Sequence, residues 1–428
     1  MMERAVLVGI NLEDGTDFDR SMKELKALAE ACGMEVCGIV TQNLPYVNKA
    51  YYIGSGKVEE VRELATNLEA SVIVFDNPLS PAQLGNLKEA TGKAVLDRTN
   101  LILQIFSTRA RTREAKLQVE VANLQYLLPR LVGAYDALSR QGGGSGSMSN
   151  KGAGEKKLEL DRRRIEKRLS MLRRELKEIE GERVTQRKSR MKSDLAVVAL
   201  VGYTNAGKSS LMNGMLANAN EYEEKQVFEK DMLFATLDTT VRKIEVPRKK
   251  GFLLTDTVGF IDKLPHQLVK AFYSTLEEVK NADVLLHVVD VSDPDYKEHI
   301  RVTLDTLHEL EADHIPRITV FNKADLAGIS SNVKEMFAKH VTGQEEIKIC
   351  MSAKNREDIE DLIQYVNRFA YREEKICELL LPFDKGNIYS YLKKNAGVLE
   401  EEYRAEGIRI KAALSEQDAG KYAEYVQK

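Results

Sequence analysis

The chain has few residues of the kinds that mark metal-rich, secreted or membrane-embedded proteins. Its 428 residues include no tryptophan, six histidines and four cysteines, and the cysteines form no C-x-x-C pair. We therefore expect no zinc site and interpret the cysteines as free thiols in a reducing compartment. No apolar run approaches the roughly 18 residues of a membrane-spanning helix, and the N-terminus lacks the apolar core of a signal peptide. These absences predict a soluble, cytoplasmic protein with no membrane span.

Charged residues are abundant but nearly balanced. Lysine and arginine number 63 and aspartate and glutamate 66, which gives a formal net charge of −3. The overall charge therefore indicates no class of partner, and only local clusters can do so. Length alone predicts roughly two to three domains. The patterns along the chain divide it more finely, into segments 1–110, 111–193, 194–369 and 370–428.

The first segment, residues 1–110, alternates short apolar runs with amphipathic stretches. This alternation predicts a small α/β domain with a mainly parallel sheet. Gly54–Lys57 superficially resembles a phosphate-binding loop, but it lacks the upstream glycine and a following serine or threonine, so we interpret it as a turn into a helix. The expected strands are Ala5–Ile10, Glu35–Val40, Ser71–Phe75 and Lys93–Leu96, and the expected helices are Ser21–Ala31, Lys57–Leu68 and Ala82–Ala90.

Two heptad patterns characterise residues 111–193. In both, apolar residues recur at alternating spacings of four and three, which keeps one apolar stripe facing a partner helix. The glycine-rich stretch Gln141–Gly154 between them should hold no regular element, because ordering glycine costs much chain entropy. We predict an antiparallel helical hairpin with a glycine-rich tip; the alternative is a flexible linker between two domains. The seam residues are Leu117, Val121, Leu124 and Leu128, and then Ile165, Leu169, Leu172, Leu176 and Ile179.

The second half of this hairpin is strongly basic. Residues 155–192 contain 15 lysines and arginines against 8 aspartates and glutamates, a net charge of +7. A charge run of this kind is often only a solvated helix face. A basic arm around a glycine-rich tip, in a chain of nearly neutral charge, favours contact with nucleic acid instead. No aromatic residues are interleaved with the basic ones, so contacts to phosphates or to helix shape are expected rather than base stacking.

The two remaining segments predict different folds. In residues 194–369, strand-like runs alternate with helical stretches, which indicates a doubly wound α/β sheet with ligands at the carboxyl ends of its strands. Residues 370–428 predict a small α+β module without visible chemistry. The expected strands are Leu195–Val201, Val241–Val246, Gly251–Thr255, Val284–Val289, Arg317–Phe321 and Ile347–Met351, followed in the last segment by the strand Ile376–Leu381, the helix Asn387–Lys394, two strands meeting around Ala405–Gly407, and the helix Ser415–Val426.

The strongest motif lies at the start of the third segment. An apolar run is followed by a loop of the form G-x-x-x-x-G-K-[ST] and then by a helical pattern, which is the context that a phosphate-binding loop requires. Successive backbone N–H groups and a helix N-terminus would face the anion. Lys208 would neutralise the terminal phosphates, and the Ser209 hydroxyl would ligate Mg²⁺. The residues of the loop are Gly202, Tyr203, Thr204, Asn205, Ala206, Gly207, Lys208, Ser209 and Ser210.

Four further motifs predict that the nucleotide is GTP or GDP. Asp256 ends a strand, where it could hold Mg²⁺ through water, and the Gly259 N–H could bond the terminal phosphate. The Asp325 carboxylate could accept both guanine N–H donors, whereas adenine would leave it unpaired. Thr236 could complete the Mg²⁺ shell. The motifs are Phe234, Ala235, Thr236, Leu237, Asp238; Asp256, Thr257, Val258, Gly259; Asn322, Lys323, Ala324, Asp325; and Ser352, Ala353, Lys354.

The five motifs, in this order, resemble the set found in translation-factor-related P-loop GTPases. The flanking sequence narrows the resemblance to the HflX family over roughly residues 5 to 370. The stretches that carry it are Tyr52–Glu60, Leu96–Thr99, Ile105–Ala110, Leu124–Leu131 and Phe234–Asp238.

This resemblance implies a ribosome-associated GTPase. Such proteins have an N-terminal domain with a helical arm ahead of a G domain. They bind the large ribosomal subunit and its rRNA, and they are linked to ribosome splitting or rescue. By motif, Asn322 would tie the base-binding loop to the phosphate loop, Lys323 would pack along the base, and Ser352–Lys354 would reach the guanine oxygen. The chain departs from the family pattern at Thr239, Ala153 and Lys156, where proline, proline and threonine are common. We expect the protein to act as a monomer.

Three residue types bear on the hydrolysis step. Many GTPases orient the attacking water with a glutamine directly after the glycine of the third motif. Phe260 stands there and cannot bond water, so we predict slow intrinsic hydrolysis that needs a partner. Asn205 is a candidate potassium ligand by resemblance, the alternative being an ordinary loop hydrogen bond. His266 and His287 are not expected to be general bases, because phosphoryl transfer depends mainly on positioning and electrostatics.

Three functions remain open on these grounds. The first is a GTPase that couples hydrolysis to release from a ribosomal particle. The second is a nucleotide-gated, RNA-binding assembly factor whose turnover is incidental. The third, an ATP-dependent RNA remodeller acting through the N-terminal domain, has only basic charge and an α/β pattern in its favour.

Overall fold

The computed structural model describes residues 2–12, 17–141, 148–191, 195–219, 234, 237, 240–247, 249–263, 278–329 and 346–427. The chain divides into two compact units. The first comprises Met1–Glu180, Met232–Leu237 and Asp262–Tyr273, and the second comprises Gly181–Asp231, Asp238–Ile261 and Ser274–Lys428. No helix within the described ranges is both long enough and apolar enough to cross a bilayer.

The N-terminal α/β domain lies in the first unit. Its sheet is entirely parallel, with strand order β2-β1-β3-β4, and four helices pack with it, as the alternating pattern predicts. Local signals set the helix boundaries: Ser80 and Gln83 form a capping box around Pro81 at the start of α3, and Gly54 caps α2. The elements are β1 Glu3–Asn11, α1 Phe18–Ala31, β2 Met34–Asn43, α2 Ser55–Asn67, β3 Val72–Phe75, α3 Pro81–Thr91, β4 Ala94–Asp97 and α4 Arg98–Arg109.

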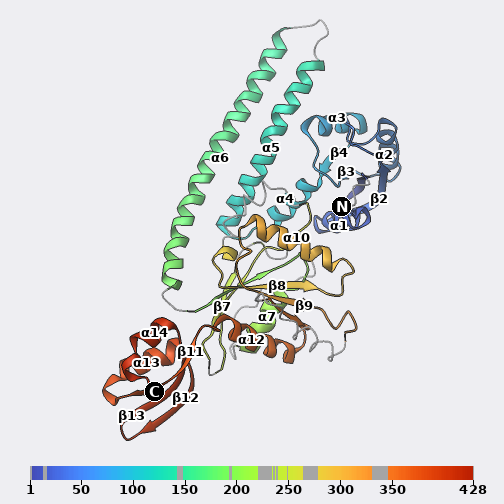
Figure 1. Cartoon of the computed structure of the whole chain (residues 1–428). Helices are drawn as coiled ribbons and strands as arrows, with labels where there is room; N and C mark the ends of the chain where they lie inside the picture. Colours follow the sequence, from blue (N-terminus) through green and yellow to red (C-terminus); the bar gives the residue numbers. More distant parts are fainter. Residues whose placement is uncertain are drawn as a thin grey trace. The chain divides into compact units, whose positions relative to one another are not determined.

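The helical hairpin follows, and it belongs to the same unit as far as Glu180. Helices α5 (Arg113–Gln141) and α6 (Met148–Met191) lie side by side (Figure 1) and bury the predicted seam, in which Leu117, Val121, Leu169 and Leu172 form the centre. The Arg168 guanidinium donates twice to Glu120 across the seam, at 2.7 and 2.8 Å. The hairpin prediction is confirmed by this packing.

One part of that prediction is wrong. The stretch Gln141–Gly154 was expected to hold no regular element, yet α6 already begins at Met148 and runs through Gly152 and Gly154. A glycine in a helix costs about 1 kcal/mol relative to alanine, whereas extending an existing helix adds one hydrogen bond per residue. The long helix therefore tolerates two glycines in its first turns.

The second unit contains the doubly wound sheet, in the order β10-β9-β8-β5-β7-β6. All neighbours are parallel except β6, which pairs antiparallel with β7. Strand β5 lies between β7 and β8, so the strand order reverses there and a crevice opens outside its carboxyl end. The elements are β5 Val197–Val201, α7 Lys208–Ala219, β6 Thr240–Ile244, β7 Phe252–Asp256, β8 Val284–Asp290, α10 Tyr296–Glu309, β9 Arg317–Asn322, β10 Glu346–Cys350 and α12 Arg356–Ala370.

A small α+β module ends the chain, as predicted. Its antiparallel sheet has the order β11-β13-β12, and the alternation of Ile408, Ile410 and Ala412 with Arg409 and Lys411 places the apolar side chains in the core. The charged side chains of the other face pair across the strands. The elements are β11 Lys375–Leu381, α13 Gly386–Asn395, β12 Gly397–Arg404, β13 Gly407–Leu414 and α14 Glu416–Lys421.

Candidate functional site

The phosphate-binding loop connects β5 to α7 and requires glycine at both ends. Gly202 has a φ of +146°, and a Cβ there would lie 2.2 Å from the carbonyl oxygen of Val288. Gly207 has a φ of +93°, and a Cβ there would lie 2.2 Å from Nδ2 of Asn322. These backbone conformations and close approaches exclude any larger residue. The two glycines of the sequence pattern are therefore fixed by geometry.

Lys208 is the first residue of α7 and its side chain is buried in the loop. Its Nζ donates to the carbonyl oxygens of Gly202 at 3.0 Å and Tyr203 at 2.8 Å. Burial lowers the pKa of Lys208 to about 8, with the nearby Asp256 carboxylate opposing that shift. The charged ammonium therefore lacks full compensation from the protein and would be stabilised by an anion. Ser209 and Ser210 follow in the first turn of α7.

Asp256 ends β7 and supplies oxygen atoms beside Ser209. The Ser209 hydroxyl donates to Asp256 Oδ2 at 2.9 Å, and Asp256 is completely buried. A hydroxyl and a carboxylate are the hard oxygen donors that Mg²⁺ accepts, so this pair fits the ion. The residues placed to hold Mg²⁺ are therefore Ser209 directly and Asp256, either directly or through water. The ion would supply positive charge beside the phosphates.

The third motif is joined to the phosphate loop by main-chain hydrogen bonds. The Phe260 N–H donates to Gly202 O at 3.1 Å, and the Thr204 N–H donates to Phe260 O at 2.8 Å. Gly259 packs so closely that a Cβ there would lie 2.9 Å from Lys208 Nζ and from the Cα and Cγ2 of Thr204. The Phe260 side chain is 2% exposed and lies in the interior. The hydroxyl of Thr257 donates to Leu200 O at 2.6 Å, and Val258 is buried beside it in the sequence.

The motifs that the sequence predicts to bind the base line a pocket of about 320 Å³. Asn322 connects its loops: its Nδ2 donates to Ala206 O at 3.0 Å, and its Oδ1 accepts from the Ala353 N–H at 2.9 Å. Lys323 forms an ion pair with Asp290 at 2.7 Å. Ala324 donates its N–H to Met351 O, which joins this loop to the end of β10. The residues that line the pocket are Ala324, Asp325, Ile329, Ser352, Lys354, Asn355 and Asp358.

Sequence reasoning missed two acidic residues of this region. Asp358 is buried and accepts from the Ser352 N–H at 2.8 Å, which fixes the loop that follows β10. Asp290 holds Lys323 from the end of β8. Each lies in a recognisable sequence pattern. Asp358 is one of the acidic residues that follow Asn355, which is a pattern typical of a helix N-terminus. Asp290 follows an apolar run at the end of a strand. Neither signal identifies a partner by itself.

The remaining candidate residues lie elsewhere. Phe234 and Leu237 are buried in the first unit, where the Phe234 ring contacts Phe106 edge to face at a centroid distance of 4.7 Å. Thr236, like Ala235, Asp238 and Thr239, lies outside the described residues, as does His266. His287 is buried in β8; burial, together with the charges of Arg317 and Lys208, lowers its pKa to about 3. It is a neutral core residue at physiological pH.

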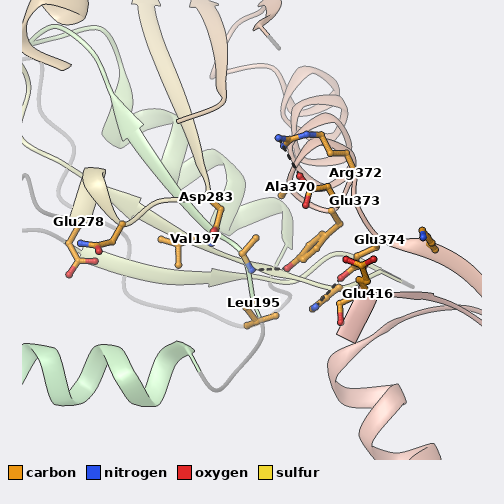
Figure 2. Close-up of a pocket in the computed structure, with 15 residues that line it drawn as sticks. Leu195, Val197, Glu278, Asp283, Ala370, Arg372, Glu373, Glu374 and Glu416 are labelled. Carbon is orange, nitrogen blue, oxygen red and sulfur yellow. Dashed lines mark hydrogen bonds and ion pairs between the residues drawn. The ribbon is translucent and has the colours of Figure 1, made fainter. Parts of the chain in front are cut away.

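A second pocket, of about 830 Å³, lies at the opposite edge of the same sheet, where β5 and β8 begin (Figure 2). Several of its polar groups bond within the protein: Lys250 bonds Glu374 at 3.1 Å, and Asp283 accepts from the Val197 N–H at 2.7 Å. The Tyr371 hydroxyl accepts from the Ala196 N–H. None of the sequence motifs that predict nucleotide binding lines this pocket.

Three family models match the chain in succession. A model described as GTP-binding GTPase N-terminal covers residues 19–107, one described as GTP-binding GTPase Middle Region covers 109–190, and one described as 50S ribosome-binding GTPase covers 197–323.

Relatives named GTPase HflX are similar over nearly the whole chain. That of Caldanaerobacter subterraneus is 45% identical over 415 residues, which is 96% of this chain and 91% of the relative. That of Lacrimispora saccharolytica is 40% identical over 410 residues, 96% of this chain and 93% of the relative. That of Alkalihalophilus pseudofirmus is 42% identical over 410 residues, 94% of this chain and 91% of the relative.

Proposed function

The chain belongs to the HflX family of GTPases, and on that premise we propose that it binds the large ribosomal subunit and uses GTP binding and hydrolysis to dissociate, rescue or recycle ribosomes. The observation that carries this proposal is the match of residues 197–323 to a family described as a 50S ribosome-binding GTPase. We place this activity in the cytoplasm and assign it to a monomer, which size-exclusion chromatography with light scattering would test.

The basic hairpin supports an RNA-rich partner. Arg162, Arg163 and Arg164 are at least half exposed on α6, and each pairs with an acidic residue three or four positions away on the same helix. Surface pairs of this kind contribute only about 0–1 kcal/mol, so the guanidinium groups can exchange these partners for phosphates. Each phosphate contact adds salt-dependent affinity through counterion release.

Co-sedimentation with ribosomal subunits tests the proposal. The protein is mixed with large subunits in the presence of GTP, GDP or a non-hydrolysable GTP analogue, and hydrolysis is measured alongside. We expect tight binding in the GTP-like state, weak binding with GDP, and strong stimulation of hydrolysis. Nucleotide-dependent binding without stimulation would favour the assembly-factor alternative, and equal binding in all three states would contradict both.

A charge-reversal variant tests the arm. Changing Arg162, Arg163 and Arg164 to glutamate should weaken subunit binding at least about tenfold and flatten its salt dependence, while GDP affinity stays unchanged. Arg301→Glu is a matched control, because Arg301 forms the same kind of exposed ion pair within helix α10. Equal subunit affinity of the triple variant and the wild type would refute a role for these arginines.

Hydrolysis by the isolated protein should be slow. Phe260 offers no group that could bond water, and its ring is buried. Rapid turnover of purified protein that subunits do not alter would contradict this.

Asn205 adopts a φ of +61° in the phosphate loop and has an exposed side chain. We propose it as a potassium ligand: replacing K⁺ with Na⁺ should slow turnover of the wild type and leave Asn205→Ala unaffected, whereas equal wild-type rates in both salts would exclude the ion.

A further inference from the structure

Thr204 carries a buried hydroxyl that has no hydrogen-bond partner in the part of the chain that the structure describes. The residue is third in the phosphate-binding loop, is 7% exposed, and its Oγ1 has no donor or acceptor within reach among the described residues. A buried hydroxyl that lacks a partner costs about 1–3 kcal/mol. Valine has the same shape and would avoid that cost. A threonine at this position therefore calls for a partner that the described residues do not provide.

The surroundings of Thr204 locate this partner. The Thr204 N–H donates to Phe260 O at 2.8 Å, which ties the main chain of Thr204 to the third motif. Its Cγ2 and the Nζ of Lys208 both lie 2.9 Å from the Cβ position of Gly259. The Thr204 side chain and the Lys208 ammonium thus both lie against Gly259, and the sequence motifs assign the lysine and the glycine to the terminal phosphate. A ligand group that reached Lys208 here would come next to Thr204.

The protein also lacks the usual side chain for orienting water. The residue after Gly259 is Phe260, whose ring is buried and whose backbone is used to pair with the phosphate loop. The hydroxyl of Thr204, which packs against Gly259, could replace that function, because a threonine accepts one hydrogen bond while donating another.

We propose that the Thr204 hydroxyl is a catalytic group that accepts a hydrogen bond from the water attacking the terminal phosphate of GTP and holds it in line. The water oxygen forms a new bond to the γ-phosphorus while the bond from that phosphorus to the β–γ bridging oxygen breaks. GDP leaves with the bridging oxygen, and the proton released by the water ends on the inorganic phosphate. Thr204 contributes position only and takes no net proton, which is the kind of catalysis that dominates phosphoryl transfer.

The test compares Thr204→Val with Thr204→Ser. Valine keeps the shape and removes the hydroxyl, and serine keeps the hydroxyl. We measure single-turnover GTP hydrolysis with Mg²⁺ and, separately, the affinities for GDP and for a non-hydrolysable GTP analogue. We expect Thr204→Val to hydrolyse about tenfold to a hundredfold more slowly, with both affinities within about twofold of the wild type, and Thr204→Ser to retain most of the rate.

Thr255→Val is the matched control. Thr255 also has a buried hydroxyl with no partner among the described residues, but it lies in the interior strand β7, on the opposite face of the sheet from its neighbour Asp256. The same substitution there should leave hydrolysis and affinity unchanged, and GDP binding shows whether each variant is folded.

Three results would overturn the proposal. A wild-type rate in Thr204→Val means that the hydroxyl does not act in hydrolysis. A loss of GDP affinity as large as the loss of rate means that the side chain only shapes the loop. A selective loss of affinity for the GTP analogue means that the hydroxyl binds the γ-phosphate in the ground state rather than water.

Discussion

Removing the Asn322 side chain should weaken both the fold and the nucleotide site of the second unit. The side chain is 2% exposed and joins the phosphate loop, through Ala206 O, to the loop after β10, through the Ala353 N–H. In Asn322→Ala both hydrogen bonds are lost, so one buried and one partly buried backbone group lose a partner. The cost of leaving such a group without its partner is about 1–3 kcal/mol, which already includes the lost bond. We therefore expect the free energy of unfolding to fall by about 2–6 kcal/mol.

Nucleotide affinity should fall as well, because base and phosphates are bound by loops that this side chain keeps in register. A loss of about tenfold to a hundredfold corresponds to about 1.4–2.7 kcal/mol. The assays are thermal unfolding with and without GDP, and titration of a fluorescent GDP analogue.

Asn367→Ala is the matched control for this prediction. Asn367 is also a buried asparagine of the second unit, but its Nδ2 donates to Lys250 O, at the pocket edge opposite the nucleotide site. This variant should lose stability and keep its GDP affinity. If Asn322→Ala binds GDP as tightly as Asn367→Ala does, the connection between the two loops has no part in nucleotide binding.

Three further predictions concern charge, packing and the third motif. Burial lowers the pKa of Lys208 to about 8, and bound phosphates favour its charged form. GDP binding should therefore take up a proton near pH 8, and the affinity for GDP should fall as the pH rises through 8. Calorimetric titration in two buffers of different ionisation enthalpy measures this proton uptake, and identical heats would contradict it. Leu172→Ala should lower the free energy of unfolding of the hairpin by about 2–5 kcal/mol, whereas Met171→Ala, at a 42% exposed position, should change it by less than about 0.5 kcal/mol; equal effects in chemical denaturation would argue against the seam. Phe260→Gln should destabilise the second unit by about 3 kcal/mol or more, since it buries an amide in place of a ring, and should not raise the hydrolysis rate; a faster variant would show that the side chain reaches the water.

Patterns that depend on one chain segment were readable from the sequence. The heptad spacing identified the residues that α5 and α6 bury, because a helix presents every third or fourth residue on one face. The two glycines of the phosphate loop were readable for a similar reason, since the loop and the strand before it impose one backbone conformation.

The partners of the two missed acidic residues could not be predicted from the sequence. The pairing of Asp290 with Lys323 requires the register of two separate strands, and that of Asp358 with the Ser352 N–H requires the conformation of the loop between β10 and α12. The start of α6 at Met148 was missed because local glycine content argues for a loop, while the cooperative length of the helix outweighs it. The sequence does not predict that the Thr204 hydroxyl has no partner among the described residues, because a threonine in this loop gives no indication of whether its side chain is hydrogen-bonded.

The geometry around Gly259 explains how one position can lose a catalytic side chain without losing the site. Phe260 acts through its backbone: it donates to Gly202 O and accepts from the Thr204 N–H, so the third motif and the phosphate loop form one structure. These bonds place no demand on the side chain, which is free to fill the core. They do fix the main chain of Thr204, because Phe260 O accepts a hydrogen bond from the Thr204 N–H. Thr204 is also the residue whose hydroxyl has no partner among the described residues. Phe260, whose side chain cannot bond water, thus positions Thr204, the residue that we propose to bond the attacking water.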